Sequence, residues 1–395
     1  MARNKREINT SLLDTVTADM LGGGDLNFLQ DNSLRVERIL LELVRPDPLQ
    51  PRRVLPDQVY QAFHGDRMTP PQALRELIQS AQLAARQQGR PFSNVLDLLG
   101  NPDDEGSEEL PALSPEEQLV RDLVNLAMTI RDDGQVNPLT VIDVSEGVTR
   151  LFRIETGERR YWATWLLRDF IPGYESDGMI PCIIIPHESA SAFRQAKENT
   201  ARSGLSAIAM ARQAALLLLY VHNYEMPNNA VPLDFYRQAL ELRLPRGASE
   251  VVYSAMGGIT KQRFNQYKDL LRLSDEAFEL ADRHNLDEYA LRPILQLSPE
   301  THAEMVQHII QFHLTGRQVR DIVERGMDDD SSSSNENVSP HVHSFVKLMQ
   351  KMSAKDDRDF IRDLLSQERT PQMARARIES TITFLVNIRD QLAAE

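Results

Sequence analysis

Two short clusters of polar and charged residues have the composition of an anion-binding site. The first, Gln50-Pro51-Arg52-Arg53, directly follows an apolar run that predicts a strand. The second, Thr156-Gly157-Glu158-Arg159-Arg160, lies where a predicted strand passes into a predicted helix. A glycine at such a turn frees backbone N–H groups, and the helix N-terminus carries a partial positive charge. Arginines beside that terminus add paired donors for phosphate oxygens.

A third cluster, Glu198-Asn199-Thr200-Ala201-Arg202, offers ligands for a metal ion. A carboxylate next to an amide oxygen suits Mg²⁺ that is held jointly by the protein and by phosphates. Each cluster taken alone would more often be an exposed turn with surface ion pairs. Together, the three clusters predict one site for a nucleoside triphosphate, assembled from distant parts of the chain.

Strands and helices alternate in the part of the chain that must position these clusters. Apolar runs predict short strands at 40–44, 139–144, 151–154 and 180–185. One helix is predicted to begin after Ser114, where Glu117 completes a capping box. Another is predicted from Glu158 to Phe170, with an aromatic stripe towards the core. This order of elements indicates an α/β or α+β first domain.

The other segments differ from one another in composition. Residues 54–115 are predicted to be irregular, apart from a helix over 71–88 and an acidic, exposed loop. The pattern over 190–324 is almost wholly helical. The stretch 327–340 is rich in aspartate and serine, which predicts a linker. Residues 341–395 are helical again, and their apolar stripe could face a partner chain or pack within its own domain.

A helix-turn-helix is predicted between residues 249 and 273. Ser249 is expected to cap a short first helix, Gly257-Gly258 to form the turn, and Thr260 to cap the second helix. The outward side of the second helix offers amides that can read base edges and cations that can bind phosphates. The candidate DNA-contacting residues are Ser249, Thr260, Lys261, Gln262, Arg263, Asn265, Gln266 and Lys268. The alternative is a helical hairpin with a charged outer surface.

The chain has 395 residues and a net charge of −14, which at first sight argues against binding nucleic acid. What matters for DNA is the local charge, because counterion release depends on the cations at the contact. Residues 243–272 hold six basic and two acidic residues, whereas 101–117 hold seven acidic residues and no basic one. The single cysteine, Cys182, fits a reducing compartment, and neither a signal peptide nor a membrane-spanning run is apparent. A cytoplasmic protein is expected.

The order of the motifs resembles the ParB family of chromosome and plasmid partition proteins. The motifs are QPRR, GQVNPL (134–139), TGERRYWA (156–163), ENTAR (198–202) and the helix-turn-helix, over roughly 39–53 and 116–325. The resemblance implies an α+β chain with a small mixed α/β domain of the ParB and sulfiredoxin type. An all-helical DNA-binding domain and a helical C-terminal segment would follow. It also implies a clamp-closing switch operated by CTP with Mg²⁺, with at most slow CTP hydrolysis.

The same resemblance implies roles for individual residues and segments. The nucleotide would be held by Arg52, Gly157, Glu158, Arg159, Arg160 and Arg202, and the metal ion by Glu198 and Asn199. Double-stranded DNA, a second copy of the chain and a ParA-type ATPase are the implied partners, with nucleoid association and no membrane. The ATPase would contact the basic residues Arg3, Lys5 and Arg6. The expected segments are a flexible tail (1–35), a nucleotide-binding domain (36–200) with an insertion (54–115), a DNA-binding domain (201–326), a linker (327–340) and a dimerisation candidate (341–395).

Two departures from the family pattern keep other functions open. The long stretch 54–115 separates QPRR from the next helix, and Gly204 and Ala209-Met210 stand where the family has acidic residues. One alternative is a sequence-specific transcriptional regulator without a working nucleotide switch. The other is a nucleotide-dependent enzyme on the same fold, with Glu158 or Glu198 as general base. Thiol chemistry of the sulfiredoxin kind is not expected, because Glu158 stands at the position of that family's cysteine.

Overall fold

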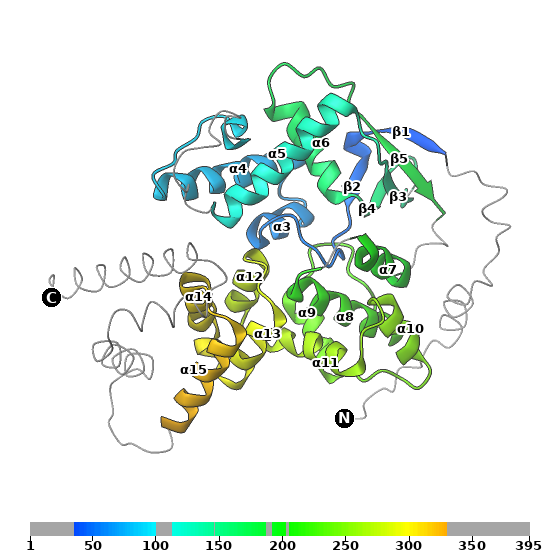
Figure 1. The fold of residues 1–395 in the computed structure, drawn as a ribbon. Coiled ribbons are helices and arrows are strands. Elements are labelled where there is room, and N and C mark those ends of the chain that lie inside the picture. Colours follow the sequence, from blue (N-terminus) through cyan, green and yellow to red (C-terminus); the bar gives the residue numbers. More distant parts are fainter. Residues whose placement is uncertain (1–34, 100–112, 146, 187–191, 203–204, 330–395) are drawn as a thin grey trace. The chain divides into compact units, whose positions relative to one another are not determined.

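The computed structural model describes residues 35–99, 113–145, 147–186, 192–202 and 205–329 (Figure 1). The side chains of residues 201–202 and 325–329 lie outside this description. The chain divides into two compact units, 1–271 and 272–395. The predicted tail, linker and C-terminal helical segment lie, wholly or in large part, outside the described residues and stay predictions.

The first unit contains a five-stranded mixed sheet in the order β1-β5-β3-β4-β2. Its strands are β1 (Val36–Leu40), β2 (Val44–Pro46), β3 (Leu139–Asp143), β4 (Phe152–Thr156) and β5 (Met179–Ile185). β3 pairs antiparallel with β4 and parallel with β5, while β1 is antiparallel to β5 and β2 is parallel to β4. The mixed α/β architecture is confirmed, and the three later strands lie close to their predicted positions.

The predicted strand near residues 40–44 is instead two strands, which form the two edges of the sheet. A single 3-10 turn, η1 (Leu41–Leu43), separates β1 from β2, and Leu41 is fully buried. The chain from Leu40 to Val44 can reach at most about 14 Å, whereas the outer strands of a flat five-stranded sheet lie about 19 Å apart. The sheet is therefore curled, so that its two edges approach each other.

Helix α6 (Glu158–Phe170) packs against one side of the sheet, and α4 (Pro70–Gln87) and α5 (Pro115–Asp133) pack against α6 and each other. Alternate strand residues such as Val141, Phe152 and Ile154 share one core with Trp162 of α6. The predicted start of α5 is confirmed. Ser114 is its N-cap, and the capping box with Glu117 is formed. Burial of this apolar face fixes the direction in which α6 leaves β4.

The expectation that residues 54–115 are largely irregular is wrong for the described part of that segment. It contains α3 (Asp57–His64) and a 3-10 helix, η2 (Val95–Leu99), in addition to α4, which confirms the helix predicted over 71–88. Leu74 and Leu77 lie at helical spacing on α4 and are fully buried in the core. The insertion is thus a structural layer of the first unit. The acidic loop at 100–112 lies outside the described residues.

The opposite side of the sheet is contacted by α7 (Ala192–Arg202), which is followed by α8 (Ala207–Val221). The Nη2 atom of Arg194 on α7 lies 2.6 Å from Glu155 Oε2. Glu155 follows the core residue Ile154 along β4, so its side chain points to the opposite side of the sheet. α8 is buried almost all round, Arg212 and Gln213 included, as its mostly apolar sequence predicts. The remaining helices of the unit are α9 (Leu233–Arg237), η5 (Gln238–Glu241), α10 (Ala248–Ala255), α11 (Lys261–Asp269) and η6 (Leu270–Arg272).

Taken by itself, the second unit is helical throughout its described part. Its helices are α12 (Asp275–Arg283), α13 (Glu288–Leu291), η7 (Arg292–Gln296), η8 (Pro299–Thr301), α14 (His302–Phe312) and α15 (Gly316–Asp329). Phe278 of α12 and Val306 of α14 are buried, as the apolar stripes of these helices predict. Among the described residues of both units, every helix is too short or too polar to cross a bilayer.

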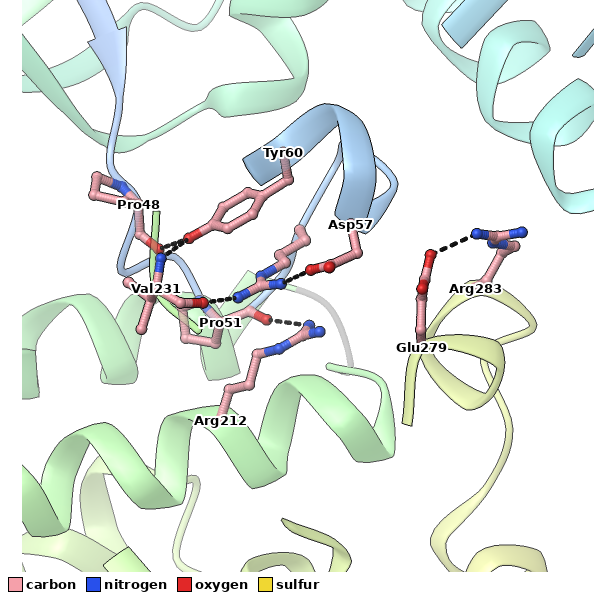
Figure 2. Close-up of polar contacts among 9 residues, drawn as sticks. Pro48, Pro51, Asp57, Tyr60, Arg212, Val231, Glu279 and Arg283 are labelled. Carbon is pink, nitrogen blue, oxygen red and sulfur yellow. Dashed lines mark hydrogen bonds and ion pairs between the residues drawn. The ribbon is translucent and has the colours of Figure 1, made fainter. Parts of the chain in front are cut away.

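A buried arginine, Arg53, binds the segment after β2 to the helical part of the first unit (Figure 2). Its guanidinium donates to Asp57 Oδ1 at 2.6 Å and to the Val231 carbonyl at 2.8 Å. It also lies 3.8 Å above the centre of the Tyr60 ring. The Tyr60 hydroxyl donates to the Pro48 carbonyl at 2.7 Å and accepts from the Val231 N–H at 3.2 Å. The segment carrying QPRR is thus held by a buried polar network.

Candidate functional site

The three sequence clusters meet at one pocket of the first unit, with a volume of about 430 Å³. Its lining includes these residues predicted to bind nucleotide or metal: Arg52, Gly157, Glu158, Arg159, Arg160, Glu198 and Asn199. The remaining one, Arg202, is the last residue of α7, and its side chain lies outside the described residues. Segments far apart in the sequence thus face a single cavity.

The turn between β4 and α6 brings backbone donors to this pocket. Gly157 is the N-cap of α6 and has φ 103°, a left-handed conformation that glycine adopts without strain. A Cβ atom added there would lie 3.1 Å from Leu139 Cγ and 3.2 Å from an Arg160 guanidinium nitrogen. The first turn of α6 leaves the N–H groups of Glu158 and Arg159 without carbonyl partners in the helix. The helix start therefore offers an anion both donors and partial positive charge.

The two arginines of this turn are engaged differently. Arg159 is exposed, and its Nη2 atom lies 3.3 Å from Asp122 Oδ2 on α5, in a surface pair of the kind that adds little stability. Arg160 instead donates from Nη1 to the carbonyls of Asn137 and Pro138, the latter at 2.6 Å. It therefore holds the end of the GQVNPL motif against the start of α6. Arg159 can turn towards an anion, whereas Arg160 first of all positions a loop.

Glu158 places a carboxyl group beside the predicted phosphate site. Burial raises its pKa to about 7, although a hydrogen bond from Trp162 Nε1 at 3.0 Å favours the carboxylate. The negative charge of Asp47 acts in the same direction as burial, and the positive charge of Arg53 opposes it. A carboxyl that is partly protonated near neutral pH repels phosphate less than an ordinary glutamate does. The position is therefore suited to an anion in spite of its residue type.

Helix α7 supplies the acidic and amide groups of the pocket, Glu198 and Asn199. Within the part of the chain that the structure describes, the buried Nδ2 atom of Asn199 and the buried Oγ1 atom of Thr156 make no hydrogen bond. Buried polar atoms are usually paired, so two such atoms at one pocket point to a bound ligand or water. They fit a hydrated cation or a phosphate better than an apolar ligand.

The donor set also limits how a metal ion could bind. No group of three or more His, Cys, Asp or Glu residues that could hold a metal occurs in the described ranges. A Mg²⁺ ion on Glu198 and Asn199 would therefore take its other ligands from phosphate oxygens and water, which is its usual habit in nucleotide sites. The residues present thus fit Mg²⁺ only together with a nucleotide.

Six further residues line the pocket without having been predicted as ligands, three of them inside the quoted motifs: Gln50, Val54, Leu126, Asn137, Thr156 and Leu205. Gln50 belongs to the first cluster, and its Nε2 atom donates to the Glu155 carbonyl at 2.6 Å, which ties that cluster to the end of β4. Thr156 could have been found from the alternation of β4, since it shares a side of the strand with Ile154. The apolar lining residues carry no signal in the sequence.

The predicted helix-turn-helix corresponds to α10 and α11. Gly257 and Gly258 form the turn with φ of 84° and 73°, and Thr260 caps α11 by accepting from the Arg263 N–H at 3.2 Å. Phe264 is buried, and its ring lies 5.5 Å from that of Tyr253 on α10. The turn and the second cap are as predicted, and α11 is followed by the 3-10 turn η6.

Two of the predicted DNA-contacting residues have other local roles. Ser249 is not the N-cap of α10, which begins at Ala248 after Gly247, in the left-handed region at φ 91°. The glycine lets the helix begin earlier than a serine cap would. Lys268 donates from Nζ to the carbonyls of Leu240 and Leu242, at 3.3 and 3.2 Å. Those carbonyls end η5, so this lysine stabilises a helix terminus, and its contact with DNA stays a prediction.

The remaining candidates form the outward surface of α11. Lys261, Gln262 and Asn265 are exposed, and Thr260 is exposed at the cap. Arg263 and Gln266 are partly exposed. The Arg263 guanidinium donates to the Tyr267 hydroxyl at 3.0 Å and lies 4.7 Å from the centre of its ring. This surface combines amides and cations in the first two turns of a helix, which is where such helices contact base edges and phosphates.

The helix-turn-helix directly contacts α7. A Cβ atom added at Gly257 would lie only 2.6 Å from Thr200 Cγ2, so glycine is required there by space as well as by conformation. The Thr200 hydroxyl lies 2.8 Å from the Ala196 carbonyl and 3.4 Å from the Ala255 carbonyl at the end of α10. The helix that carries two residues of the pocket therefore also touches the turn of the DNA-binding motif.

The chain matches no protein-family model and no curated protein sequence. One solved structure to which it is similar is the C-terminally truncated chromosome-partitioning protein ParB from Caulobacter crescentus complexed to the centromeric parS site. That match has 16% identity and a TM-score of 0.28 and covers 57% of this chain and 93% of that chain. The same Caulobacter protein complexed with CTP-gamma-S gives 17% identity and a TM-score of 0.17, over 53% of this chain and 92% of that one. TM-scores of this size do not establish a common fold, so the resemblance to ParB proteins rests on the motifs of the sequence.

Proposed function

We propose that the chain is a ParB-like DNA-binding protein of chromosome or plasmid partition, switched by CTP and Mg²⁺ bound in the pocket of about 430 Å³. One observation carries the proposal: three motifs from distant sequence positions line that one cavity, beside the start of α6. The choice of CTP among nucleotides comes from the resemblance of the motifs to the ParB family. A homodimer on a palindromic DNA site and a ParA-type partner belong to the same proposal.

The chemistry of the pocket divides between its two sides. The phosphates would lie at the start of α6, where backbone N–H groups and Arg159 offer donors, with Arg52 on the same lining. Glu198 and Asn199 would hold Mg²⁺ through their side-chain oxygens. The metal supplies charge neutralisation for the phosphate oxygens. We propose at most slow hydrolysis of CTP, because the two acidic residues of the pocket, Glu158 and Glu198, already serve in binding.

The DNA-binding side rests on α11. Its exposed first turns would enter the major groove, with Lys261 and Arg263 at phosphates and Gln262 and Asn265 at base edges. The acidic net charge does not oppose this, because the segment around α11 is locally basic and faces the nucleic acid. Contact between α7 and the turn at Gly257 gives a route by which an occupied pocket would shift the helix-turn-helix.

The proposal is tested by titrating the full-length protein with each of the four ribonucleoside triphosphates, with and without Mg²⁺ and with cognate or random DNA. Selective, Mg²⁺-dependent binding of CTP supports the proposal. Specific DNA binding without any nucleotide binding would replace it by a transcriptional regulator. Rapid nucleotide turnover in the absence of DNA would replace it by an enzyme.

Replacing Arg159 by alanine is expected to weaken CTP binding by at least about tenfold, because a charge-assisted phosphate contact is lost. The fold should be unaffected, since Arg159 is exposed and only its surface pair with Asp122 is broken. Isothermal titration calorimetry measures the affinity. Arg131→Ala is the matched control, because Arg131 is an exposed arginine on α5 that does not line the pocket. Equal affinity of Arg159→Ala and wild-type protein would remove Arg159 from the phosphate site.

Replacing Arg263 by alanine is expected to weaken DNA binding about tenfold and to reduce the dependence of affinity on salt by about one ion. The reason is the loss of one cation from the outward surface of α11. Fluorescence anisotropy with labelled duplex DNA over a salt series measures both quantities. Arg283→Ala, which removes a positive charge from α12, serves as the control. An unchanged affinity and salt dependence would assign DNA binding to another surface.

A further inference from the structure

A second, smaller pocket of about 210 Å³ lies on the other side of β4 from the nucleotide pocket. Successive residues of a strand point to opposite sides of the sheet, so Thr156 lines one pocket while Arg153 and Glu155 line the other. The two linings share no residue. Ligand binding to the second pocket is therefore a separate question from nucleotide binding.

The polar part of this pocket is built around a buried carboxylate. Glu155 is only 4% exposed, and its Oε2 atom lies 2.6 Å from Arg194 Nη2. Its Oε1 atom is buried and receives no hydrogen bond from any residue that the structure describes. An unpaired carboxylate oxygen in the interior is costly, so it favours the binding of a hydrogen-bond donor. A donor that carries positive charge gains most from such a partner.

The surrounding charges leave room for a cation. Burial raises the pKa of Glu155 even though Arg194 opposes this effect, and the neighbouring Asp47 raises it further. The Arg194 side chain is 43% exposed, so water screens much of its charge. Burial also raises the pKa of Asp47, although the positive charge of Arg153 opposes this effect. Because burial disfavours the charged form of both carboxyl groups, a further donor that carries positive charge would favour it.

The rest of the lining is mostly apolar. Leu49, Leu216 and Met226 form walls, together with the ring of Tyr220. An alkyl chain attached to the cation would gain contact with these side chains on leaving water. An aromatic ring beside a cation adds a further attraction. The pocket thus combines one unsatisfied anionic atom with an apolar surface of small size.

We propose that this second pocket binds a primary alkylammonium group, with the nitrogen at Glu155 Oε1 and the carbon chain against Leu216 and Met226. The group could belong to a free amine or to a lysine side chain of another protein. Both sources present the same chemistry to the pocket, namely three N–H donors on a short apolar chain. The two sources are distinguished by experiment.

The test uses the full-length protein and two probes, n-butylammonium chloride and Nα-acetyl-lysine methylamide. Saturation-transfer NMR measures binding of each probe, with 1-butanol and butyrate as the uncharged and negatively charged analogues. We expect saturable binding of n-butylammonium and no comparable signal from either analogue. Equal binding of 1-butanol would overturn the proposal, because the contact would then be purely apolar.

Two substitutions test separately whether binding needs the charge of Glu155 and whether it needs the open volume of the pocket. Glu155→Gln keeps the shape and an acceptor oxygen but removes the charge, and it should weaken binding of n-butylammonium at least about tenfold. Ala192→Leu keeps every charge and fills the pocket from the first residue of α7, and it should abolish binding. Glu241→Gln, at an exposed position in η5, is the matched control and should bind as wild type. Urea unfolding of each variant verifies that it is folded.

Loss of binding of both probes in Glu155→Gln supports a site open to a lysine side chain. Binding of n-butylammonium alone, lost in the same variant, supports a free amine as the ligand. Failure of both probes to bind wild-type protein would overturn the proposal, as would equal binding by Glu155→Gln and wild type. Nucleotide titration of the same samples shows separately whether the larger pocket works, so that failures of the two proposals are not confused.

Discussion

Replacing Gly157 by valine is expected to abolish CTP binding and to lower the free energy of unfolding by at least about 2 kcal/mol. The residue has φ 103°, which a β-branched side chain adopts only under strain. The first added carbon would also press on Leu139 and Arg160, at 3.1 and 3.2 Å. Relief of that contact would move the start of α6, where the phosphate-binding N–H groups lie. Calorimetry with CTP and urea unfolding measure the two effects.

The matched control for this experiment is Gly89→Val. Gly89 also has a left-handed φ, of 73°, but a Cβ atom added there would meet no atom within 4 Å. The control therefore bears the backbone strain without the contact at the pocket. We expect it to lose stability and to keep its CTP affinity. If Gly157→Val bound CTP as well as Gly89→Val does, the start of α6 would not be the phosphate site.

Substitutions of the adjacent residues Arg52 and Arg53 are expected to have different effects: one weakens CTP binding and the other lowers stability. Arg53→Ala should lower the free energy of unfolding by about 3 kcal/mol, because removing one partner from a buried polar network leaves the others unpaired. The Arg53 side chain is only 7% exposed and donates to both Asp57 and Val231 (Figure 2). Arg52→Ala should leave stability nearly unchanged and weaken CTP binding, because Arg52 lines the pocket.

The comparison is made by urea unfolding and by calorimetry on both variants. Arg53→Lys is a useful intermediate, because lysine keeps the charge but cannot present the planar, multiply donating group. We expect it to recover part of the lost stability. If Arg53→Ala were as stable as Arg52→Ala, the contacts that hold the QPRR segment to Val231 would carry no net stability.

The local features that the sequence predicted well are those set by neighbouring residues. The capping box at Ser114 and Glu117, the glycine turn before α6 and the Thr260 cap all depend on side chains within a few positions of each other. The sequence also predicted that the three motifs line one pocket. That prediction came from the order of the motifs along the chain and not from any single motif. The prediction for residues 54–115 was right for α4 and missed α3, because turn-forming composition was given more weight than the helical spacing of Val59 and Phe63.

Other features depend on contacts that no local pattern reveals. The pattern of cations on an outward helix surface gives no sign that Lys268 binds carbonyls at the end of η5. The TGERR motif likewise gives no sign that the Arg160 guanidinium donates to the carbonyls of Asn137 and Pro138. The second pocket requires β4, α7 and α8 to come together, so its residues show no common motif. Partners that are distant in the sequence decided each of these cases.

The curled sheet has a consequence for the order of events during protein synthesis. β1 pairs with β5, so Val36 lies opposite Ile183, and β2 pairs with β4. These pairings close long loops, which makes them slow to form. In the nascent chain, β2 therefore lacks its neighbour until the ribosome has released residues near 156, and β1 lacks its neighbour until residues near 185 are released. During that interval, the apolar strands at the N-terminal end present open edges to chaperones and to other unfinished chains.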